Sequence, residues 1–274
     1  MSKGEMLMII SASRRTDIPA CFAGEFMQWI RQGFCMVRNP FSGKVSRVSL
    51  KPEEVDCIVF WTKNPRPLMA DLPELSERGF VFYFQFTLTP YDRTVEPNLP
   101  PKEARIDTFR ELSDRLGRDK VVWRCDPVIF SDSSGWTASW HEQHFRSLCA
   151  QLAPYTEQCV ISFLDFYGKV RKNPACGAFR DASQAEMLDL AGRFSRIAGE
   201  SGIRIAACSE KLDLTCAGVP AAHCIDAERV ERITGKRISR ARDRGQRREC
   251  ACARSRDIGS YGSCRNGCVY CYAS

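Results

Sequence analysis

The sequence predicts an α/β fold, a partial (β/α)6 TIM-like barrel that ends in a C-terminal cysteine-rich segment. Six apolar, β-rich runs recur along the chain, and helical patterns separate most of them. The runs are nearly continuous rather than alternating, which is typical of parallel strands covered by helices. Six βα units are two short of a closed eight-stranded barrel, so an open barrel is favoured. A doubly wound open sheet is the alternative architecture.

The positions of the apolar runs place the predicted strands at residues 6–11, 57–62, 80–88, 121–129, 159–166 and 203–208. Helical patterns fill the intervals at 19–32, 67–78, 101–116, 139–152 and 183–200. Several of these patterns begin with Pro or after a polar cap, as at Ser183. After Cys208 the repeat gives way to loops, one short helix near 226–233 and a basic connector. We therefore expect a barrel over residues 1–210 and a capping segment over residues 211–274.

The composition is that of an ordinary globular protein, with 44% hydrophobic and 27% charged residues in a chain of 274. No apolar run approaches the length that spans a bilayer. Residues 1–10 are too short in their apolar part for a signal peptide and lack a small-residue cleavage site. We therefore expect a cytoplasmic protein without a membrane partner.

The net charge of +7 is concentrated in residues 236–248, where seven basic residues stand against one acid. Such a run can bind phosphate groups, including those of nucleic acid. The interpretation that we favour is a solvated connector whose positive charge offsets a negatively charged metal centre.

Fifteen cysteines in a chain without a secretion signal indicate metal ligands rather than disulfides. Cys57 and Cys159 lie inside apolar runs and are predicted to be buried small side chains. Five cysteines fall in the last 25 residues, and three of them form the motif C-x-x-x-C-x-x-C, at Cys264, Cys268 and Cys271. This spacing lets three thiolates converge on one iron–sulfur cluster and leaves one iron open. Zinc is the alternative, since Cys250 and Cys252 can complete a four-ligand site.

Polar side chains gather at the carboxyl ends of the predicted strands, where the active sites of parallel α/β folds lie. Gln85, Arg124 and Asp126 are the clearest cases, because polar groups inside apolar strands are costly unless they are paired. We favour a ligand pocket over an internal network that only fills the barrel mouth. The candidate ligand-binding residues are Asn64, Gln85, Thr87, Arg124, Asp126 and Asp165.

The stretch from Cys264 to Ala273, CRNGCVYCYA, resembles the cluster loop of radical S-adenosylmethionine enzymes. Its Gly-Cys-x-Tyr-Cys-Tyr-Ala form is similar to that of the relatives of spore photoproduct lyase. Almost the whole chain also resembles a bacterial family called domain of unknown function 1848. The matching stretches are residues 13–20, 37–41, 60–65, 84–91 and 256–259.

The first resemblance implies a [4Fe–4S] cluster on Cys264, Cys268 and Cys271, whose open iron takes the amino and carboxylate groups of S-adenosylmethionine. Reductive cleavage then gives methionine and a 5′-deoxyadenosyl radical, which abstracts hydrogen from a substrate. It further implies a six-unit partial barrel and a reducing partner such as flavodoxin or ferredoxin. The substrate stays open, with nucleic acid among the candidates.

This chain departs from the family pattern in two ways. The motif usually follows the first strand, but here it follows all six, as in a circularly permuted chain. The Gly-Gly-Glu stretch that commonly holds the methionine amino group is also missing after the second strand. From their chemistry we assign Arg124 to a carboxylate of the ligand and Asp126 or Asp165 to ribose hydroxyls. Contacts with methionine or adenine are then assigned to Asn64, Gln85 and Thr87.

A second set of cysteines is left for interpretation. Cys208, Cys224, Cys250 and Cys252 could hold a second iron–sulfur cluster or a zinc ion, or they could be unliganded thiols. A protein of a different class is the alternative for the whole chain. It would be a non-catalytic zinc- or iron–sulfur-bearing protein that binds nucleic acid through the basic connector.

Overall fold

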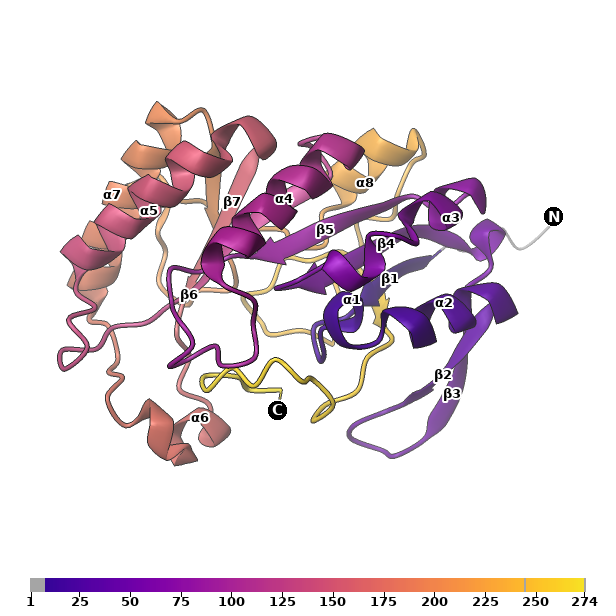
Figure 1. Ribbon diagram of the computed structural model, residues 1–274, viewed down its shortest axis with the longest axis horizontal. Helices are drawn as coiled ribbons and strands as arrows, with labels where there is room; N and C mark the ends of the chain where they lie inside the picture. Colours follow the sequence, from indigo (N-terminus) through magenta and orange to yellow (C-terminus); the bar gives the residue numbers. More distant parts are fainter. Residues whose placement is uncertain (1–7, 244, 274) are drawn as a thin grey trace.

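The computed structural model describes residues 8–243 and 245–273 and contains a seven-stranded parallel sheet (Figure 1). The strand order is β8-β7-β6-β5-β4-β1-β9. The strands are β1 (Met8–Ala12), β4 (Val55–Thr62), β5 (Phe82–Thr87), β6 (Val121–Val128), β7 (Gln158–Phe163), β8 (Arg204–Ala207) and β9 (Ser255–Asp257). All six predicted strands are confirmed, although Met6 and Leu7 of the first prediction lie outside the described residues.

The strand order shows how the sheet is wound. From β1 to β8 each new strand is added on the same side, without the reversal of order that defines a doubly wound sheet. The exception is β9, which the sequence did not predict. It pairs in parallel with the other side of β1, from Ile9 opposite Ser255 to Ser11 opposite Asp257. Among the described residues, the edge strands β8 and β9 do not pair with each other.

The predicted helices connect successive strands. They are α2 (Ala23–Gln32), α3 (Leu72–Glu77), α4 (Lys102–Leu116), α5 (Ala138–Leu152) and α7 (Gln184–Glu200). The polar cap predicted at Ser183 is confirmed, because Ser183 and Glu186 form a reciprocal capping box at the start of α7. The helix predicted at 19–32 is divided at Phe22 into α1 (Ile18–Cys21) and α2, and the predicted short helix is α8 (Ala227–Thr234). The elements that the sequence did not predict include α6 (Gly168–Lys172) and the hairpin of β2 (Phe34–Arg38) and β3 (Val45–Ser49).

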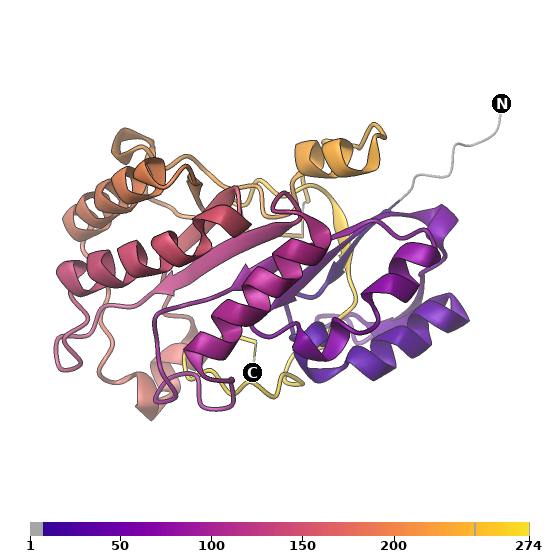
Figure 2. The ribbon, with the colours of Figure 1, turned by 45° about the horizontal axis from the view of Figure 1, so that its top comes forward.

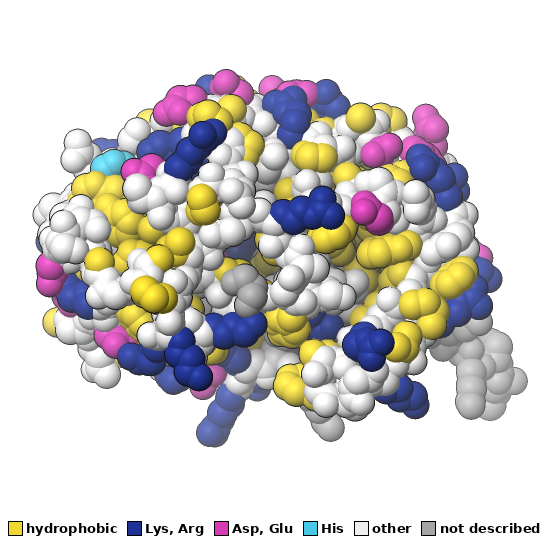
Figure 3. Space-filling view, turned by 60° about the horizontal axis from the view of Figure 1, so that its bottom comes forward, with side chains coloured by type: hydrophobic (Ala, Val, Ile, Leu, Met, Phe, Trp, Pro, Cys, Tyr) yellow, Lys and Arg dark blue, Asp and Glu magenta, His cyan; other side chains and the backbone are white. Residues whose placement is uncertain are grey.

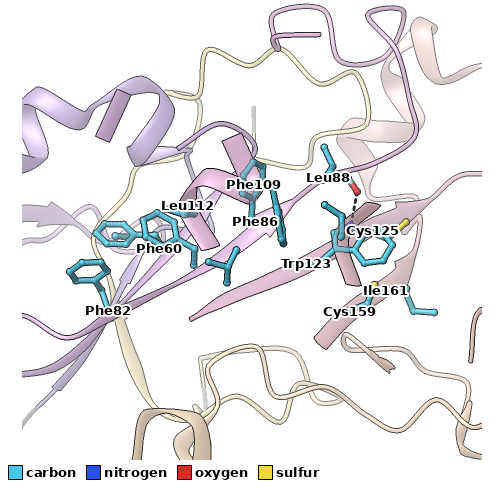
Figure 4. Packing of buried hydrophobic residues seen from close by; sticks show 14 of the residues in the cluster. Phe60, Phe82, Phe86, Leu88, Phe109, Leu112, Trp123, Cys125, Cys159 and Ile161 are labelled. Atoms are coloured by element: carbon cyan, nitrogen blue, oxygen red, sulfur yellow. Dashed lines mark hydrogen bonds between the residues drawn. The ribbon is translucent and has the colours of Figure 1, made fainter. Parts of the chain in front are cut away.

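One face of the sheet packs against these connecting helices. Phe60 of β4 stacks on Phe84 of β5 with ring centroids 4.8 Å apart. The ring of Phe86 meets that of Phe109 of α4, with centroids 5.1 Å apart (Figure 4). The indole of Trp123 is buried in the same layer and donates to the carbonyl oxygen of Leu88 at 2.9 Å. Continuous burial on both faces explains why the strands read as unbroken apolar runs.

The opposite, inner face is covered by the chain that follows β8. Residues between 222 and 253, including α8 (Ala227–Thr234), pack on Val59, Tyr83, Val122 and Val160 of the sheet. Figure 2 shows α8 set apart from the connecting helices. Cys57 and Cys159 are fully buried in the sheet, as predicted. Among the described residues, no helix is long and apolar enough to cross a membrane.

Candidate functional site

The loop that carries Cys264, Cys268 and Cys271, called here the loop cysteines, follows β9 directly. It lies across the carboxyl end of the sheet, where Figure 1 shows it as the yellow trace near the C-terminus. Asn266 donates through Nδ2 to Asp17 at 2.8 Å, and the backbone nitrogen of Val269 donates to Val95 at 3.0 Å. Asp17 follows β1 and Val95 follows β5, so the loop spans the ends of several strands.

The loop cysteines lie in a partly apolar setting. Cys268 is buried, while Cys264 and Cys271 are half-buried. The side chains of Cys268 and Tyr270 pack in an aromatic cluster with Tyr91 and Trp136. Burial, with smaller contributions that include the charges of Cys271 and Cys264, raises the pKa of Cys268 to about 12. The three thiols are therefore close enough to sense one another electrostatically.

A fourth cysteine touches this loop. The thiols of Cys21, at the end of α1, and Cys264 are hydrogen-bonded. That contact lowers the pKa of Cys264 to about 6 and raises the pKa of Cys21. Cys264 therefore ionises more readily than Cys268.

A buried ion network holds the loop against the sheet. The carboxylate of Glu96 accepts hydrogen bonds from Lys63 Nζ at 2.8 Å, from Arg105 Nη1 at 3.1 Å and from Thr89 Oγ1 at 2.8 Å. The hydroxyl of Tyr270, in the middle of the cysteine motif, also donates to Glu96. Burial opposes charge on Glu96, but the Lys63 and Arg105 cations outweigh it and lower the pKa of this carboxyl. Tyr270 is therefore held in place by two charged side chains, the Glu96 carboxylate and the Lys63 ammonium group.

A second network joins β9 to the end of β1. The carboxylate of Asp257 accepts from Ser11 Oγ and the Arg14 backbone nitrogen, both at 2.9 Å, and from Ser13 Oγ at 2.6 Å. Gly259 follows at a point of very close approach, since a Cβ there would lie 2.1 Å from Ser13 Oγ. Only glycine fits this position without displacing its neighbours.

The structure brings three of the six predicted ligand-binding residues together. Arg124 donates to Asp126 through both Nε, at 3.1 Å, and Nη2, and its Nη1 lies 3.3 Å from Gln85 Oε1. Gln85 also donates to the carbonyl oxygen of Cys224 at 2.7 Å. These side chains thus form the kind of internal network that the sequence left as the alternative to a ligand pocket.

Of the other three predicted residues, Thr87 lies beside this network, whereas Asn64 and Asp165 have partners elsewhere. Asn64 accepts from the backbone nitrogen of Arg66 at 3.3 Å in the turn after β4. Thr87 is half-buried at the end of β5, opposite Arg124 in the sheet register. Asp165 is exposed and pairs with Arg247 of the basic connector.

The remaining cysteine group lies on the inner face of the sheet. Cys208, Cys224, Cys250 and Cys252, called here the inner cysteines, form a chain of thiol contacts. Among the described residues, no group of three or more histidine, cysteine, aspartate or glutamate side chains stands ready to hold a metal ion. A [4Fe–4S] cluster binds each thiolate at a different iron, so its ligands need not surround a single point. The loop cysteines fit such a cluster by donor type.

The rim around the loop cysteines carries exposed aromatic and basic side chains. Figure 3 views this side of the molecule, where Lys and Arg lie between hydrophobic groups. Tyr167 and Tyr272 are exposed and have ring centroids 5.5 Å apart. Arg247 lies over Tyr167, and Arg15 lies over the exposed ring of Tyr261. The rim therefore presents cations on aromatic faces to solvent.

Comparison with protein families gives a match over residues 9–273 to the domain of unknown function DUF1848. The chain belongs to the DUF1848 family. No curated protein matches it. One solved structure, a candidate alpha-L-fucosidase from Bacteroides thetaiotaomicron, is 11% identical over 85% of each chain, with a TM-score of 0.30.

Several site residues of this DUF1848 protein could not be singled out from the sequence alone. Glu96 lies in a loop with no motif around it, yet its side chain is 1% exposed and bonded to the cysteine loop. Asp257 belongs to a strand of only three residues, too short for periodicity to show. Lys63 had a signal, because it directly follows β4 among the polar residues at the strand ends.

Proposed function

We propose that this DUF1848 protein is a radical S-adenosylmethionine enzyme on a partial (β/α)6 barrel, with its cluster held by Cys264, Cys268 and Cys271. The observation that carries the proposal is the position of the loop. It follows a parallel strand, β9, and crosses the carboxyl end of the sheet beside β1. Chemistry in parallel α/β folds is built at that end.

The strand order supports the permutation that the sequence suggested. Read across the sheet from its β9 edge, the order is β9, β1, β4, β5, β6, β7 and β8. In this spatial order the cysteine loop follows the first strand, although it is last along the chain. The family that the loop resembles has its motif after the first strand, so this spatial order supports a permuted chain of that kind. Within the described residues β8 and β9 stand at opposite ends of the sheet and do not pair with each other, which fits an open barrel.

When bound, a cluster at this loop would supply an electron and an open iron for S-adenosylmethionine. The chain's own residues prepare the place for it. Cys268 lies in the aromatic cluster of Tyr91, Trp136 and Tyr270, which excludes water from that side. Glu96 and Lys63 hold Tyr270 in position, and Lys63 lowers the cost of negative charge on Cys268.

The proposed contacts of S-adenosylmethionine are the six residues named from the sequence. Asn64, Thr87 and Asp165 are half-buried or exposed, so a ligand at the mouth can reach them. Gln85, Arg124 and Asp126 already bind one another, so they would contact a ligand only by exchanging a partner. We therefore place the first contacts on the former group and expect Arg124 to contribute less.

The test is anaerobic reconstitution with iron and sulfide, followed by chemical reduction and a 5′-deoxyadenosine assay. We expect about four irons in the loop cluster and 5′-deoxyadenosine above background. Cys268→Ala should lower product formation by about a thousandfold, because the cluster loses one of its three protein ligands. Cys216→Ala, at an exposed thiol away from the loop, is the control and should match the wild type.

The rival function is a non-catalytic zinc- or iron–sulfur-bearing protein that binds nucleic acid. The basic and aromatic rim favours nucleic acid as a partner, since exposed rings and arginines offer stacking and phosphate contacts. A protein that takes up no iron at the loop, releases no 5′-deoxyadenosine and binds single-stranded nucleic acid would establish the rival. Iron-dependent product together with nucleic-acid binding would instead name the substrate class of the enzyme.

A further inference from the structure

The inner cysteines come from three separate segments of the chain. Cys208 directly follows β8, Cys224 lies in the loop before α8, and Cys250 and Cys252 precede β9. Cys224, Cys250 and Cys252 are 1%, 8% and 2% exposed, and Cys208 is half-buried. Segments far apart in sequence thus bring four thiols together at a buried, apolar position on the inner face of the sheet.

The four sulfur atoms form a continuous chain of contacts. The sulfurs of Cys208 and Cys224 are 3.3 Å apart. Thiol hydrogen bonds also join Cys224 to Cys252, and Cys252 to Cys250. A disulfide needs a separation of about 2.05 Å, so the pair at 3.3 Å is not bonded. Four thiolates around one zinc ion lie about 3.8 Å apart, given a Zn–S length of about 2.3 Å and tetrahedral angles.

The surroundings favour negative charge on these sulfurs. Arg124 donates through Nη1 to the sulfur of Cys224 at 2.9 Å, and the backbone nitrogen of Ile225 donates to Cys252 at 3.3 Å. The guanidinium groups of Arg14 and Arg124 both lie over the Trp61 ring, 5.1 and 5.0 Å from its centroid. Arg14 also hydrogen-bonds to Cys252. Two cations therefore contact this one group of thiols and favour negative charge on its sulfur atoms.

Buried polar atoms without partners point to the same place. Among the described residues, five buried side-chain atoms lack a hydrogen-bond partner, and three of them belong to Arg14, Trp61 and Ser209. Trp61 packs against the same apolar cluster as the inner cysteines, and Ser209 follows Cys208. An unsatisfied buried polar group costs about 1–3 kcal/mol, and a negatively charged thiolate is a stronger acceptor for such donors than a neutral thiol.

We propose that Cys208, Cys224, Cys250 and Cys252 bind a single zinc-like metal ion in a tetrahedral, four-thiolate site. The sulfurs are now in contact with one another rather than spread around a point, so binding replaces their mutual hydrogen bonds by metal–sulfur bonds. Four thiol protons leave for solvent, and a divalent ion with four thiolates carries a net charge of −2. Arg14 and Arg124 offset that charge.

The site would connect the two ends of the sheet. Cys208 extends from the edge strand β8, while Cys252 lies shortly before the other edge strand, β9. An ion that binds both would fix the segment between them and hold β9 beside β1. A closed four-thiolate site of this kind is structural rather than catalytic, because it leaves no position open. This inference does not depend on the proposed radical chemistry at the loop cysteines.

The test uses the full chain, stripped of metal under reducing conditions and titrated with Co²⁺ and then with Zn²⁺. We expect about one tightly bound ion per chain, with the intense visible absorption of tetrahedral cobalt thiolate. The loop variant Cys264→Ser/Cys268→Ser/Cys271→Ser should keep this ion, so failure of the proposed function leaves the result unchanged. Cys224→Ser should weaken zinc binding by at least about a hundredfold, while Cys216→Ser should not.

A second measurement keeps the proposal falsifiable if Cys224→Ser does not fold. In the wild type, zinc should protect the inner cysteines from alkylation, as read by mass spectrometry of the labelled peptides. Three results would overturn the proposal. They are equal labelling with and without zinc, a Cys208–Cys224 disulfide in the protein as isolated, or four irons on this site in place of one ion.

Discussion

The two cysteine groups of this protein differ in how the fold brings them together. The loop cysteines come from one short motif at the carboxyl end of the sheet, and Cys264 and Cys271 are half-buried there. The inner cysteines come from three segments and touch one another under the covering chain. A short motif at an open edge suits a centre that must meet ligands. A closed group among buried arginines suits a centre that only holds the chain together.

The contacts behind each group differ in the same way. The loop depends on one buried carboxylate, Glu96, which holds Tyr270 through hydrogen bonds and a pair of cations. The inner group depends on Arg124, a cation that faces the sulfurs directly. The loop is thus held in position by Glu96, a residue outside the cysteine motif. In the inner group, Arg124 instead offsets negative charge on the sulfur atoms by direct contact. Each of the following predictions tests one side of this contrast.

The largest stability effect is expected for Glu96→Gln. The change leaves Lys63 and Arg105 buried without their carboxylate, and removing one partner of a buried ion pair costs about 3–5 kcal/mol. Chemical denaturation should show this loss, and trypsin should cut faster after Arg265 in the loosened loop. Glu111→Gln, which breaks exposed ion pairs with Arg66 and Arg115, should cost less than about 1 kcal/mol. Equal effects in the two variants would remove Glu96 as the anchor.

A smaller loss is expected for Gly259→Ala. The new methyl group would lie 2.1 Å from Ser13 Oγ, so β9 must shift away from the end of β1. We expect a cost of about 2 kcal/mol in the free energy of unfolding. Gly24→Ala in α2 is the matched control, because nothing lies within 4 Å of its added methyl group. If both alanine variants are as stable as the wild type, the chain at Gly259 does not approach Ser13 as closely as described.

An effect of similar size should come from His141, which lies outside both cysteine groups and reports on the scaffold. Its Nε2 donates to Ile129 at 2.8 Å, and burial lowers the pKa of the imidazole to about 4. The neutral ring is favoured in the folded state, so its stabilisation is complete above pH about 6.5 and is lost as pH falls towards 4. We expect a decrease of about 2 kcal/mol over that interval.

His141→Gln keeps a donor for Ile129 but does not titrate, so its stability should change less over the same pH interval. Parallel denaturation series at pH 7 and pH 4.5 provide the comparison. An unchanged pH dependence in His141→Gln would show that another group is responsible.

The sheet could be predicted from the sequence because its strands are buried on both faces. The runs in β4 and β5 are long enough to show as apolar segments, and their helices carry ordinary start signals. β9 could not be predicted, because three residues with polar side chains carry no strand pattern. Its place beside β1 depends on contacts of Asp257 with Ser11 and Ser13, which are more than 240 positions away in sequence.

The candidate site likewise has a part that could be predicted from the sequence and a part that could not. The loop cysteines are visible as a motif because their spacing is local. Glu96 is invisible, because its role comes from Lys63, Arg105 and Tyr270, which meet only in the fold. The inner cysteines were named from the sequence as a possible set, but only the fold shows the contact between Cys208 and Cys224. What the sequence cannot predict is which residues, distant along the chain, become partners in the fold.

The central claim is that the two cysteine groups hold different metals for different purposes. The most direct measurement is the iron and zinc content, after identical anaerobic loading, of a loop variant and an inner variant. We predict that Cys264→Ser/Cys268→Ser/Cys271→Ser loses about four irons and keeps its zinc, and that Cys224→Ser loses about one zinc and keeps its iron. Loss of both metals together in either well-folded variant, or of neither, would contradict the account.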